Sequence, residues 1–445
     1  MRLKNTLTNI KEEFQPLGDR VGIYTCGMTV QTIPHIGHMK TFITADVLKR
    51  YLIFKGYQVT HVTNFTDIDD KIIIKAKESG EDWRALAQRN IDIFFKVSDH
   101  LNIMRADYYP RATQFIEEII SLIDRLIQRG FGYIVDGDVY FPVERFPKYG
   151  QLAKKELKEL MPGARVAVDE KKRHPLDFAL WKAAKEGEPW WYSPWGKGRP
   201  GWHIECSAMS MYLLGETFDI HTGAEDLIFP HHENEIAQSV SATGKNFVRF
   251  WIHNTWLSLS GEKMSKSTGH YLTAEEILQK YSPQAIRLFF LKSHYRMPQE
   301  YDEDRLKEAE LAFDRVRAFL NRVEPIGEEV LRLTDFEAAM DDDLNTPKAL
   351  GIIFELVREG YEKIDSSEAK KIAHSVRVLL EVLGFDLAPS ISGREKALIE
   401  ELIRLRSNLR REKRYDLADQ IRSRLKELGV IVEDKREGSI WRVVR

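Results

Sequence analysis

The sequence lacks any long apolar run. None of its 445 residues belongs to a stretch near the ~18 apolar residues that a membrane-spanning helix needs. The N-terminal segment MRLKNTLTNIKEEF also lacks the apolar core of a secretory signal. We therefore expect a protein of the cytoplasm that has no membrane partner.

Cysteine is scarce, with only Cys26 and Cys206 in the chain. Two cysteines so far apart exclude a disulfide framework, and the absence of a CxxC pair removes the usual spacing signal for a metal site. Spacing alone therefore favours two buried structural thiols over two metal ligands.

Neither sign of charge dominates, because 66 Lys and Arg stand against 68 Asp and Glu, for a net charge of -2. This balance excludes a uniformly basic nucleic-acid coat. Residues 401–445 nevertheless carry 13 basic against 8 acidic side chains, so the end of the chain is locally basic and suited to contact phosphates. The phosphate-binding patterns GxxxxGK[ST] and GxGxxG are absent, which disfavours P-loop and dinucleotide-binding proteins.

The order of predicted elements indicates the fold class. Residues 21–27 predict a buried strand, 37–54 a helix and 57–65 a second strand, the order that builds a parallel sheet. Strand character returns at 218–222 and 247–254. We predict an α/β protein with a Rossmann-like parallel-sheet catalytic domain and an inserted subdomain, followed by an all-helical domain and a small C-terminal element.

The domain boundaries are expected where composition and periodicity change. The predicted regions are the catalytic domain at 1–304, its insertion at about 110–200, a loop and stem-contact region at about 255–304, the helical domain at 305–395 and the basic C-terminal element at 396–445.

Two short motifs carry the chemistry. His35, Gly37 and His38 form the string HIGH between the first strand and the first helix, where two imidazoles and a bare glycine allow close approach to a polyphosphate. Lys263 and Lys266 belong to KMSKS, a polar segment whose two ammonium groups can neutralise phosphate charge. Either string alone fits an ordinary capped helix or charged turn, but their pairing on this scaffold indicates nucleotide chemistry.

The pairing of HIGH with KMSKS resembles the class I aminoacyl-tRNA synthetases. Further segments are similar to the cysteinyl-tRNA synthetase family, and the similarity spans nearly the whole chain. These segments are TDIDDK at 66–71, GWHIECS at 201–207, FPHHENE at 229–235, MDDDLNTP at 340–347 and residues 418–441.

The resemblance implies a cysteine–tRNA ligase that activates L-cysteine with ATP and transfers it to the 3′ end of tRNA(Cys). It implies one Zn²⁺ per chain, Mg²⁺ with ATP, a monomer, and tRNA binding by the helical domain and the C-terminal element. The implied residues are the zinc ligands Cys26, Cys206, His231 and Glu235, the cysteine contacts Thr66 and Trp202, the ATP-binding residues His35, Gly37, His38, Lys263 and Lys266, and the catalytic side chains His35, His38, Lys263 and Lys266.

A zinc ion suits the selection of cysteine over serine. The two amino acids differ by one atom, and pocket shape separates such near-isosteres by only roughly 10- to 200-fold. A metal that binds the substrate sulfur as a ligand gains far less binding free energy from a serine hydroxyl.

Several positions near the expected site depart from the family pattern. They are Met28, Gln31, Thr32, Met39, Lys40, Thr222, Ala224, Thr255 and His270. Two alternatives therefore stay open: a cysteine-activating ligase that acts on a small amine, as in mycothiol synthesis, and a tRNA-binding paralogue that has lost turnover. The presence of residues 305–445 disfavours the first alternative, and the retained histidines and lysines disfavour the second.

Overall fold

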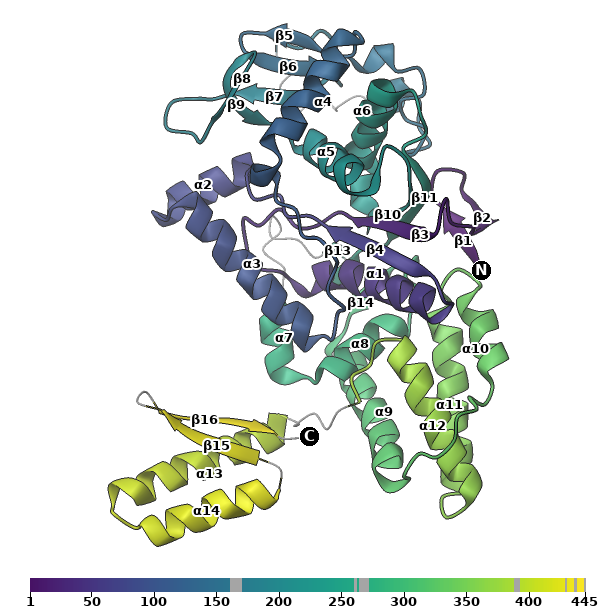
Figure 1. The fold of residues 1–445 in the computed structure, drawn as a ribbon, viewed down its shortest axis with the longest axis vertical. Helices are drawn as coiled ribbons and strands as arrows, with labels where there is room; N and C mark the ends of the chain where they lie inside the picture. Colours follow the sequence, from purple (N-terminus) through teal and green to yellow (C-terminus); the bar gives the residue numbers. More distant parts are fainter. Residues whose placement is uncertain are drawn as a thin grey trace.

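The computed structural model describes residues 1–160, 170–259, 262–263, 272–387, 393–428, 430–435 and 438–443. Within these ranges no helix is both long and apolar enough to cross a membrane. A central parallel sheet, an antiparallel sheet above it, a group of helices below it and a small C-terminal unit make up the molecule (Figure 1).

The central sheet has four parallel strands in the order β11-β10-β3-β4. Their bounds are β3 (Arg20–Thr25), β4 (Gln58–Thr63), β10 (Phe218–Ala224) and β11 (Val248–Asn254). The chain moves from β3 to β4 on one side and later adds β10 on the other side. The carboxyl ends of β3 and β10 therefore form a topological switch point, which is where ligands bind in open α/β sheets.

Both faces of this sheet are covered, as expected for parallel strands. On one face, Ile23 and Ile220 pack into the core that contains α1 (Ile36–Phe54). On the other face, Tyr24 and Trp251 belong to a second core. That second core also contains apolar residues of α4 (Ile116–Gln128), α5 (Trp202–Leu214) and α6 (Glu233–Thr243). The Rossmann-like sheet predicted from the sequence is confirmed.

The region between β4 and β10 contains the expected insertion. It holds a five-stranded sheet in the order β5-β6-β7-β9-β8, in which all pairs are antiparallel. Its strands are β5 (Tyr133–Val135), β6 (Asp138–Phe141), β7 (Phe178–Ala183), β8 (Trp191–Ser193) and β9 (Gly196–Pro200). Strand β9 leads directly into α5, so the inserted sheet is continuous with a helix of the central domain.

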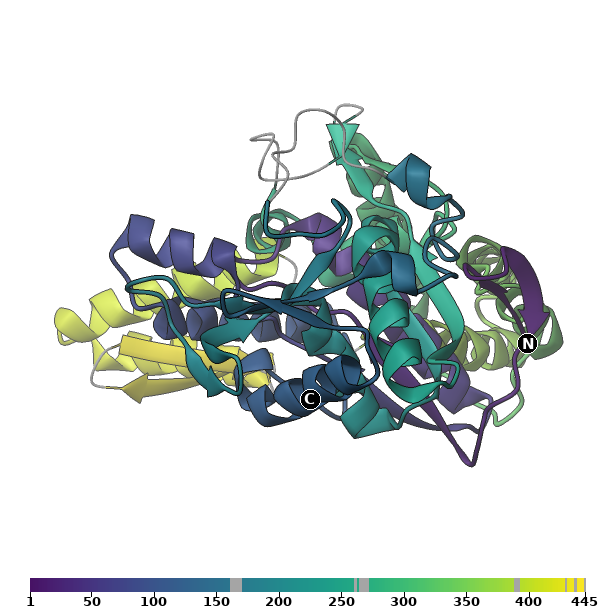
Figure 2. The same cartoon turned by 90° about the horizontal axis from the view of Figure 1, so that it is seen from above.

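Short elements complete the central domain. A hairpin of β1 (Arg2–Asn5) and β2 (Ile10–Glu13) lies beside the helices below the sheet in both Figure 1 and Figure 2. The backbone N–H of Arg2 donates to the carbonyl of Asp341 at 2.7 Å. The other elements are α2 (Asp70–Ser79), α3 (Trp83–His100), β12 (Leu257–Leu259), β13 (Glu262–Lys263), α7 (Ala274–Lys280), α8 (Pro283–Leu291) and β14 (Gln299–Tyr301).

Four helices below the sheet share its core. Buried residues of all four, such as Phe319 and Leu379, belong to the same apolar cluster as Ile43 of α1. Asn345 and Pro347 begin α11 as its N-cap and as a proline in its first turn. The four helices are α9 (Glu303–Arg322), α10 (Leu333–Met340), α11 (Thr346–Glu362) and α12 (Ser367–Val382).

The C-terminal unit has its own small core of Ile403, Leu425, Val430 and Val432. It consists of α13 (Gly393–Arg411), α14 (Tyr415–Glu427) and a hairpin of β15 (Val430–Lys435) and β16 (Gly438–Val443), drawn in yellow in Figure 1. The basic side chains of α14 are exposed, as the helical pattern of the sequence predicts.

Candidate active site

The four side chains that are expected to bind a metal come from separate parts of the fold. Cys26 directly follows β3 at the switch point, and Cys206 lies in α5. His231 lies in the turn before α6, and Glu235 lies in the first turn of that helix. All four are buried, with exposed fractions between 0% for Glu235 and 5% for Cys26.

The structure brings these four side chains together. The sulfur atoms of Cys26 and Cys206 are 3.8 Å apart, and Cys26 Sγ is 3.6 Å from Glu235 Oε1. His231 Nε2 is 3.0 Å from the same carboxylate oxygen. Two thiolates on a tetrahedral zinc would lie about 3.8 Å apart, and a thiolate and a carboxylate oxygen about 3.6 Å apart. The sulfur–sulfur and sulfur–oxygen separations therefore match those around such an ion, whereas His231 and Glu235 are at hydrogen-bond distance.

His231 and Glu235 are not joined by one regular α-helix. Their four-residue spacing does place them in contact, but Phe229 has extended backbone angles of φ -136° and ψ 133°. The regular helix therefore begins only at Glu233, and His231 lies in an irregular turn before it.

Burial and neighbouring charges shift the pKa values of the side chains in the cluster. Burial would raise the pKa of Glu235, yet His221 and His231 lower it to about 2. Burial would lower the pKa of His231, yet Glu235 and Cys206 raise it to about 10. Burial also raises the pKa of Cys26 well above its usual value. Without a metal, Glu235 is therefore ionised while Cys26 and His231 hold their protons, and a divalent cation would displace those two protons on binding.

Two histidines that the sequence did not single out orient the candidate ligands. His203 Nδ1 lies 2.9 Å from Nδ1 of His231, and His221 Nε2 lies 3.0 Å from Glu235 Oε2. Such outer contacts fix the orientation of metal ligands. No spacing signal links these two histidines in the sequence, because they lie in two different segments.

His232 is a further possible metal ligand that the sequence did not single out. Its Nε2 lies 3.3 Å from Cys26 Sγ, and its Nδ1 lies 2.7 Å from Nε2 of His253. An alternative donor set within 4.8 Å consists of Cys26, His231, His232 and Glu235. The neighbouring position of His232 in the string HHENE was the available signal.

The two expected cysteine contacts lie beside this cluster. The ring of Trp202, at the start of α5, stacks on that of His231 with 4.3 Å between centroids. Thr66 follows β4 and is buried, and its hydroxyl donates to Glu205 Oε2 at 3.0 Å. Glu205 is fully buried, and burial raises its pKa well above the usual value.

The HIGH histidines cap the helix that follows them. The N–H of His38 donates to Nδ1 of His35 at 3.2 Å, and the N–H of His35 donates to Nδ1 of His38 at 3.3 Å. Because both Nδ1 atoms accept, each neutral ring carries its proton on Nε2, the form that donates to a phosphate. A Cβ on Gly37 would lie 3.0 Å from the ring of His35, so glycine keeps this arrangement open. The N-terminus of α1 adds a favourable field for an anion.

The second motif is described only at its start. Lys263 ends the strand pair β12–β13, opposite Ser258. Lys266 and His270 lie outside the described residues. On the far side of the segment, the N–H of Ile36 donates to the carbonyl of Leu272 at 3.0 Å, and His35 pairs with Thr273. The described flanks of the KMSKS segment therefore lie next to the HIGH histidines.

Four of the divergent positions have direct contacts near the carboxyl edge of the sheet. The hydroxyl of Thr222 lies 2.8 Å from that of Thr25, which joins β10 to β3. The carbonyl of Met28 accepts from the N–H of Thr66 at 3.1 Å. Thr255 accepts from the ammonium group of Lys40 at 3.0 Å. The contacts of Thr222, Thr255 and Lys40 are made by their side chains, and that of Met28 by its backbone.

Comparison with solved structures identifies the fold. The chain matches methionyl-tRNA synthetase of Mycobacterium tuberculosis with a TM-score of 0.57 at 17% identity, covering 82% of this chain and 90% of that one. It matches a putative arginyl-tRNA synthetase of Campylobacter jejuni with a TM-score of 0.57 at 13% identity, covering 83% and 94%. Fold and motifs together define a class I aminoacyl-tRNA synthetase.

Sequence comparison identifies the family. Residues 13–311 match the class I (C) tRNA synthetase catalytic domain, 335–388 the DALR domain and 395–442 the cysteinyl-tRNA ligase anticodon binding domain. The chain is 47% identical to a cysteine–tRNA ligase of Thermodesulfovibrio yellowstonii over 100% of this chain and 99% of that protein. It is 49% identical to one of Dehalococcoides mccartyi over the full length of both. The chain belongs to the cysteinyl-tRNA synthetase family.

Proposed function

We propose that this protein activates L-cysteine with ATP to form cysteinyl-adenylate and pyrophosphate, and then transfers the cysteinyl group to the 3′ end of tRNA(Cys). The observation that carries the proposal is the buried cluster of two thiols, an imidazole and a carboxylate at the carboxyl end of the parallel sheet. An enzyme that selects cysteine needs such a group, because pocket shape alone separates cysteine poorly from serine.

The proposed cofactor is one Zn²⁺ held by Cys26, Cys206, His231 and Glu235. When bound, it supplies a Lewis acid that accepts the sulfur of the substrate as a thiolate. The mixed donor set suits zinc better than magnesium, which prefers oxygen ligands. The stacked ring of Trp202 then closes one side of the amino-acid pocket. The Thr66 hydroxyl, fixed by Glu205, contacts the substrate.

Activation requires in-line attack of the cysteine carboxylate on the α-phosphorus of ATP. His35 and His38 donate from Nε2 to the phosphates, and Gly37 permits their close approach. Lys263 and Lys266 neutralise the phosphate charge that accompanies departure of pyrophosphate, and Mg²⁺ enters with ATP. The histidine caps support this role because they fix both rings against the first turn of α1.

The helical region and the C-terminal unit are proposed to bind tRNA, with the domains divided at 304 and 395 as the composition of the sequence indicates. The exposed basic face of α14 is suited to phosphate contacts. This region also favours a tRNA acceptor over a small amine.

Pyrophosphate exchange and charging test the proposal together. We expect ATP–pyrophosphate exchange that depends on L-cysteine, far weaker exchange with L-serine, and charging of tRNA(Cys). Transfer to a small amine without charging would favour the ligase alternative. Binding of tRNA without exchange would favour a paralogue that has lost turnover.

A further inference from the structure

Lys40 is a buried cation on the helix that carries the HIGH histidines. It lies two residues after His38 and is only 2% exposed. Its ammonium group donates to Thr255 Oγ1 at 3.0 Å and to the carbonyl of Met297 at 3.2 Å. Both acceptors are uncharged, and although the charge of Glu225 favours the ammonium form, burial still lowers the pKa of Lys40 to about 8. An apolar side chain would fill this position at lower cost, which points to a role for the segments that the ammonium group joins.

Thr255 connects Lys40 to a second part of the backbone. Its hydroxyl accepts from Lys40 and donates to the carbonyl of Met297 at 2.6 Å. Its N–H donates to the carbonyl of Tyr295 at 3.0 Å. Thr255 lies between β11 and β12, and Met297 lies two residues before β14. One ammonium group therefore holds the starts of two neighbouring strands against α1.

These two strands support Lys263. Strand β12 pairs in parallel with β14, with Leu257 opposite Gln299. On its other side β12 pairs with β13, which places Ser258 opposite Lys263. The position of Lys263 relative to the HIGH histidines therefore depends on how the start of β12 is fixed to α1, where Leu257 packs beside Gly37 and Lys40 adds a polar contact.

The start of α1 holds the other flank of the same segment. The N–H of Ile36 donates to the carbonyl of Leu272, and the N–H of Ala274 donates to the carbonyl of Pro34, both at 3.0 Å. Helix α1 thus contacts the chain on both sides of residues 264–271. Lys40 supplies the side-chain contact on the first side.

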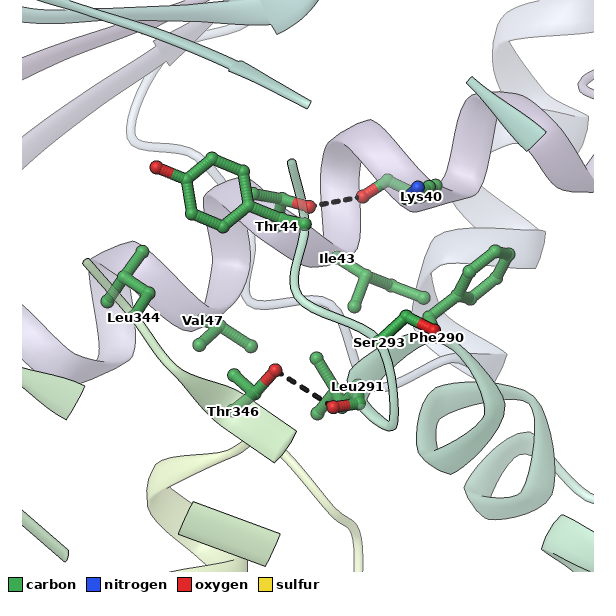
Figure 3. A pocket seen from close by; sticks show the side chains of 10 residues that line it. Lys40, Ile43, Thr44, Val47, Phe290, Leu291, Ser293, Leu344 and Thr346 are labelled. Atoms are coloured by element: carbon green, nitrogen blue, oxygen red, sulfur yellow. Dashed lines mark hydrogen bonds between the residues drawn. The ribbon is translucent and has the colours of Figure 1, made fainter. Parts of the chain in front are cut away.

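A small cavity borders this helical turn. A cavity of about 20 Å³, enough for about one water molecule, lies between α1, the end of α8 and the residues before α11 (Figure 3). Ile43, Val47 and Leu344 line it together with Lys40.

We propose that Lys40 is a positioning residue for cysteine activation, which sets the place of the β12–β13 pair and Lys263 against the HIGH histidines through Thr255 and the Met297 carbonyl. This inference rests on the proposed function. It concerns the first step only, because Lys263 acts on the phosphates of ATP and these leave as pyrophosphate before transfer to tRNA.

Single-turnover kinetics of the full chain test this role. Lys40→Met keeps the length of the side chain and removes its charge, and we expect it to slow adenylate formation by about 100-fold, the usual effect of a misplacement near 1 Å. Transfer from preformed cysteinyl-adenylate to tRNA(Cys) should keep the wild-type rate. Thr255→Val should reproduce the effect of Lys40→Met, and Thr255→Ser, which retains the hydroxyl, should restore activation.

Lys49→Met is the matched control. Lys49 lies on the same helix, is 5% exposed and donates to the Arg105 carbonyl at 2.9 Å and to Asp107 at 3.2 Å, away from β12. We expect this variant to activate cysteine at the wild-type rate. Thermal melting of every variant separates loss of folding from loss of positioning.

Three results would overturn the inference: wild-type activation by Lys40→Met, equal slowing of both steps, or additive losses in the Lys40→Met/Thr255→Val double variant. Independent residues add their effects, whereas a residue that acts through another does not. Failure of the wild-type chain to exchange pyrophosphate would instead reject the proposed function, so the two failures are distinguishable.

Discussion

At the scale of single residues, the contacts in the proposed metal site differ between two adjacent histidines. His231 contacts Glu235 at 3.0 Å, whereas His232 lies 3.9 Å from the same oxygen and contacts His253 instead.

We expect Cys206→Ser to lower the zinc content of the purified protein and to raise the KM for cysteine more than the KM for ATP, because a soft ligand is removed.

His232→Asn provides the contrast. It should retain one zinc ion per chain, measured by elemental analysis, because His232 is not among the four proposed ligands. Metal loss in His232→Asn with full retention in Cys206→Ser would show that the alternative donor set is the correct one.

A second residue-scale prediction concerns pH. Burial lowers the pKa of Lys40 from 10.5 to about 8, although the charge of Glu225 opposes the shift. Below pH 8 Lys40 is charged in both states and the folded protein bears the full cost of its burial. Between pH 8 and 10.5 only the unfolded chain holds the proton, so this residue makes the free energy of unfolding rise with pH, by up to about 3 kcal/mol.

Denaturant unfolding of wild type and Lys40→Met across this range measures the effect. The difference between the two proteins isolates Lys40 from other titrating groups. A difference that stays constant from pH 7 to pH 11 would contradict this account of the buried ammonium.

The sequence could predict the candidate ligands only through family resemblance. Cys26 and Cys206 are 180 residues apart, and nothing in their spacing indicates that their sulfur atoms lie 3.8 Å apart. The orienting histidines His203 and His221 escaped prediction because they lie in different segments and no spacing links them to His231 and Glu235. Lys40 was visible only as a departure from a pattern, since its burial depends on tertiary packing.

At the scale of elements, the described flanks of the KMSKS segment lie against α1, and its lysines are proposed to act on ATP. We expect Lys266→Ala to slow adenylate formation by about 100-fold or more, the usual effect of removing one stabilising donor. Zinc content should not change, because the metal ligands lie on other elements. Wild-type pyrophosphate exchange in this variant would remove Lys266 from the mechanism.

Local patterns predicted some elements better than others. The strand–helix–strand order at β3, α1 and β4 follows from apolar runs and helical spacing, and the structure confirms it. The strands of the inserted sheet are short, and β9 contains two glycines, so periodicity could not locate them. Their order depends on contacts between distant segments.

At the scale of the whole molecule, one apolar core runs from the parallel sheet into helices α9–α12, whereas α13 and α14 belong to a separate core. Truncation after Leu387 should therefore leave the first core intact. We expect this variant to retain cysteine-dependent pyrophosphate exchange and to charge tRNA(Cys) poorly.

We attribute the expected loss of tRNA(Cys) charging to the removal of the basic side chains of the C-terminal unit. The salt dependence of tRNA binding should become shallower by about one unit for each phosphate that is no longer neutralised. Equal loss of exchange and charging in the truncated protein would contradict the separate role of the C-terminal unit.

The central claim is that a zinc ion held by Cys26, Cys206, His231 and Glu235 recognises cysteine through its sulfur. X-ray absorption at the zinc edge of the full chain, with and without amino acid, tests it most directly. We predict two sulfur ligands in the free protein, three after addition of L-cysteine and two after addition of L-serine. An ion whose sulfur count stays at two with L-cysteine, or a purified protein without zinc, would contradict the account.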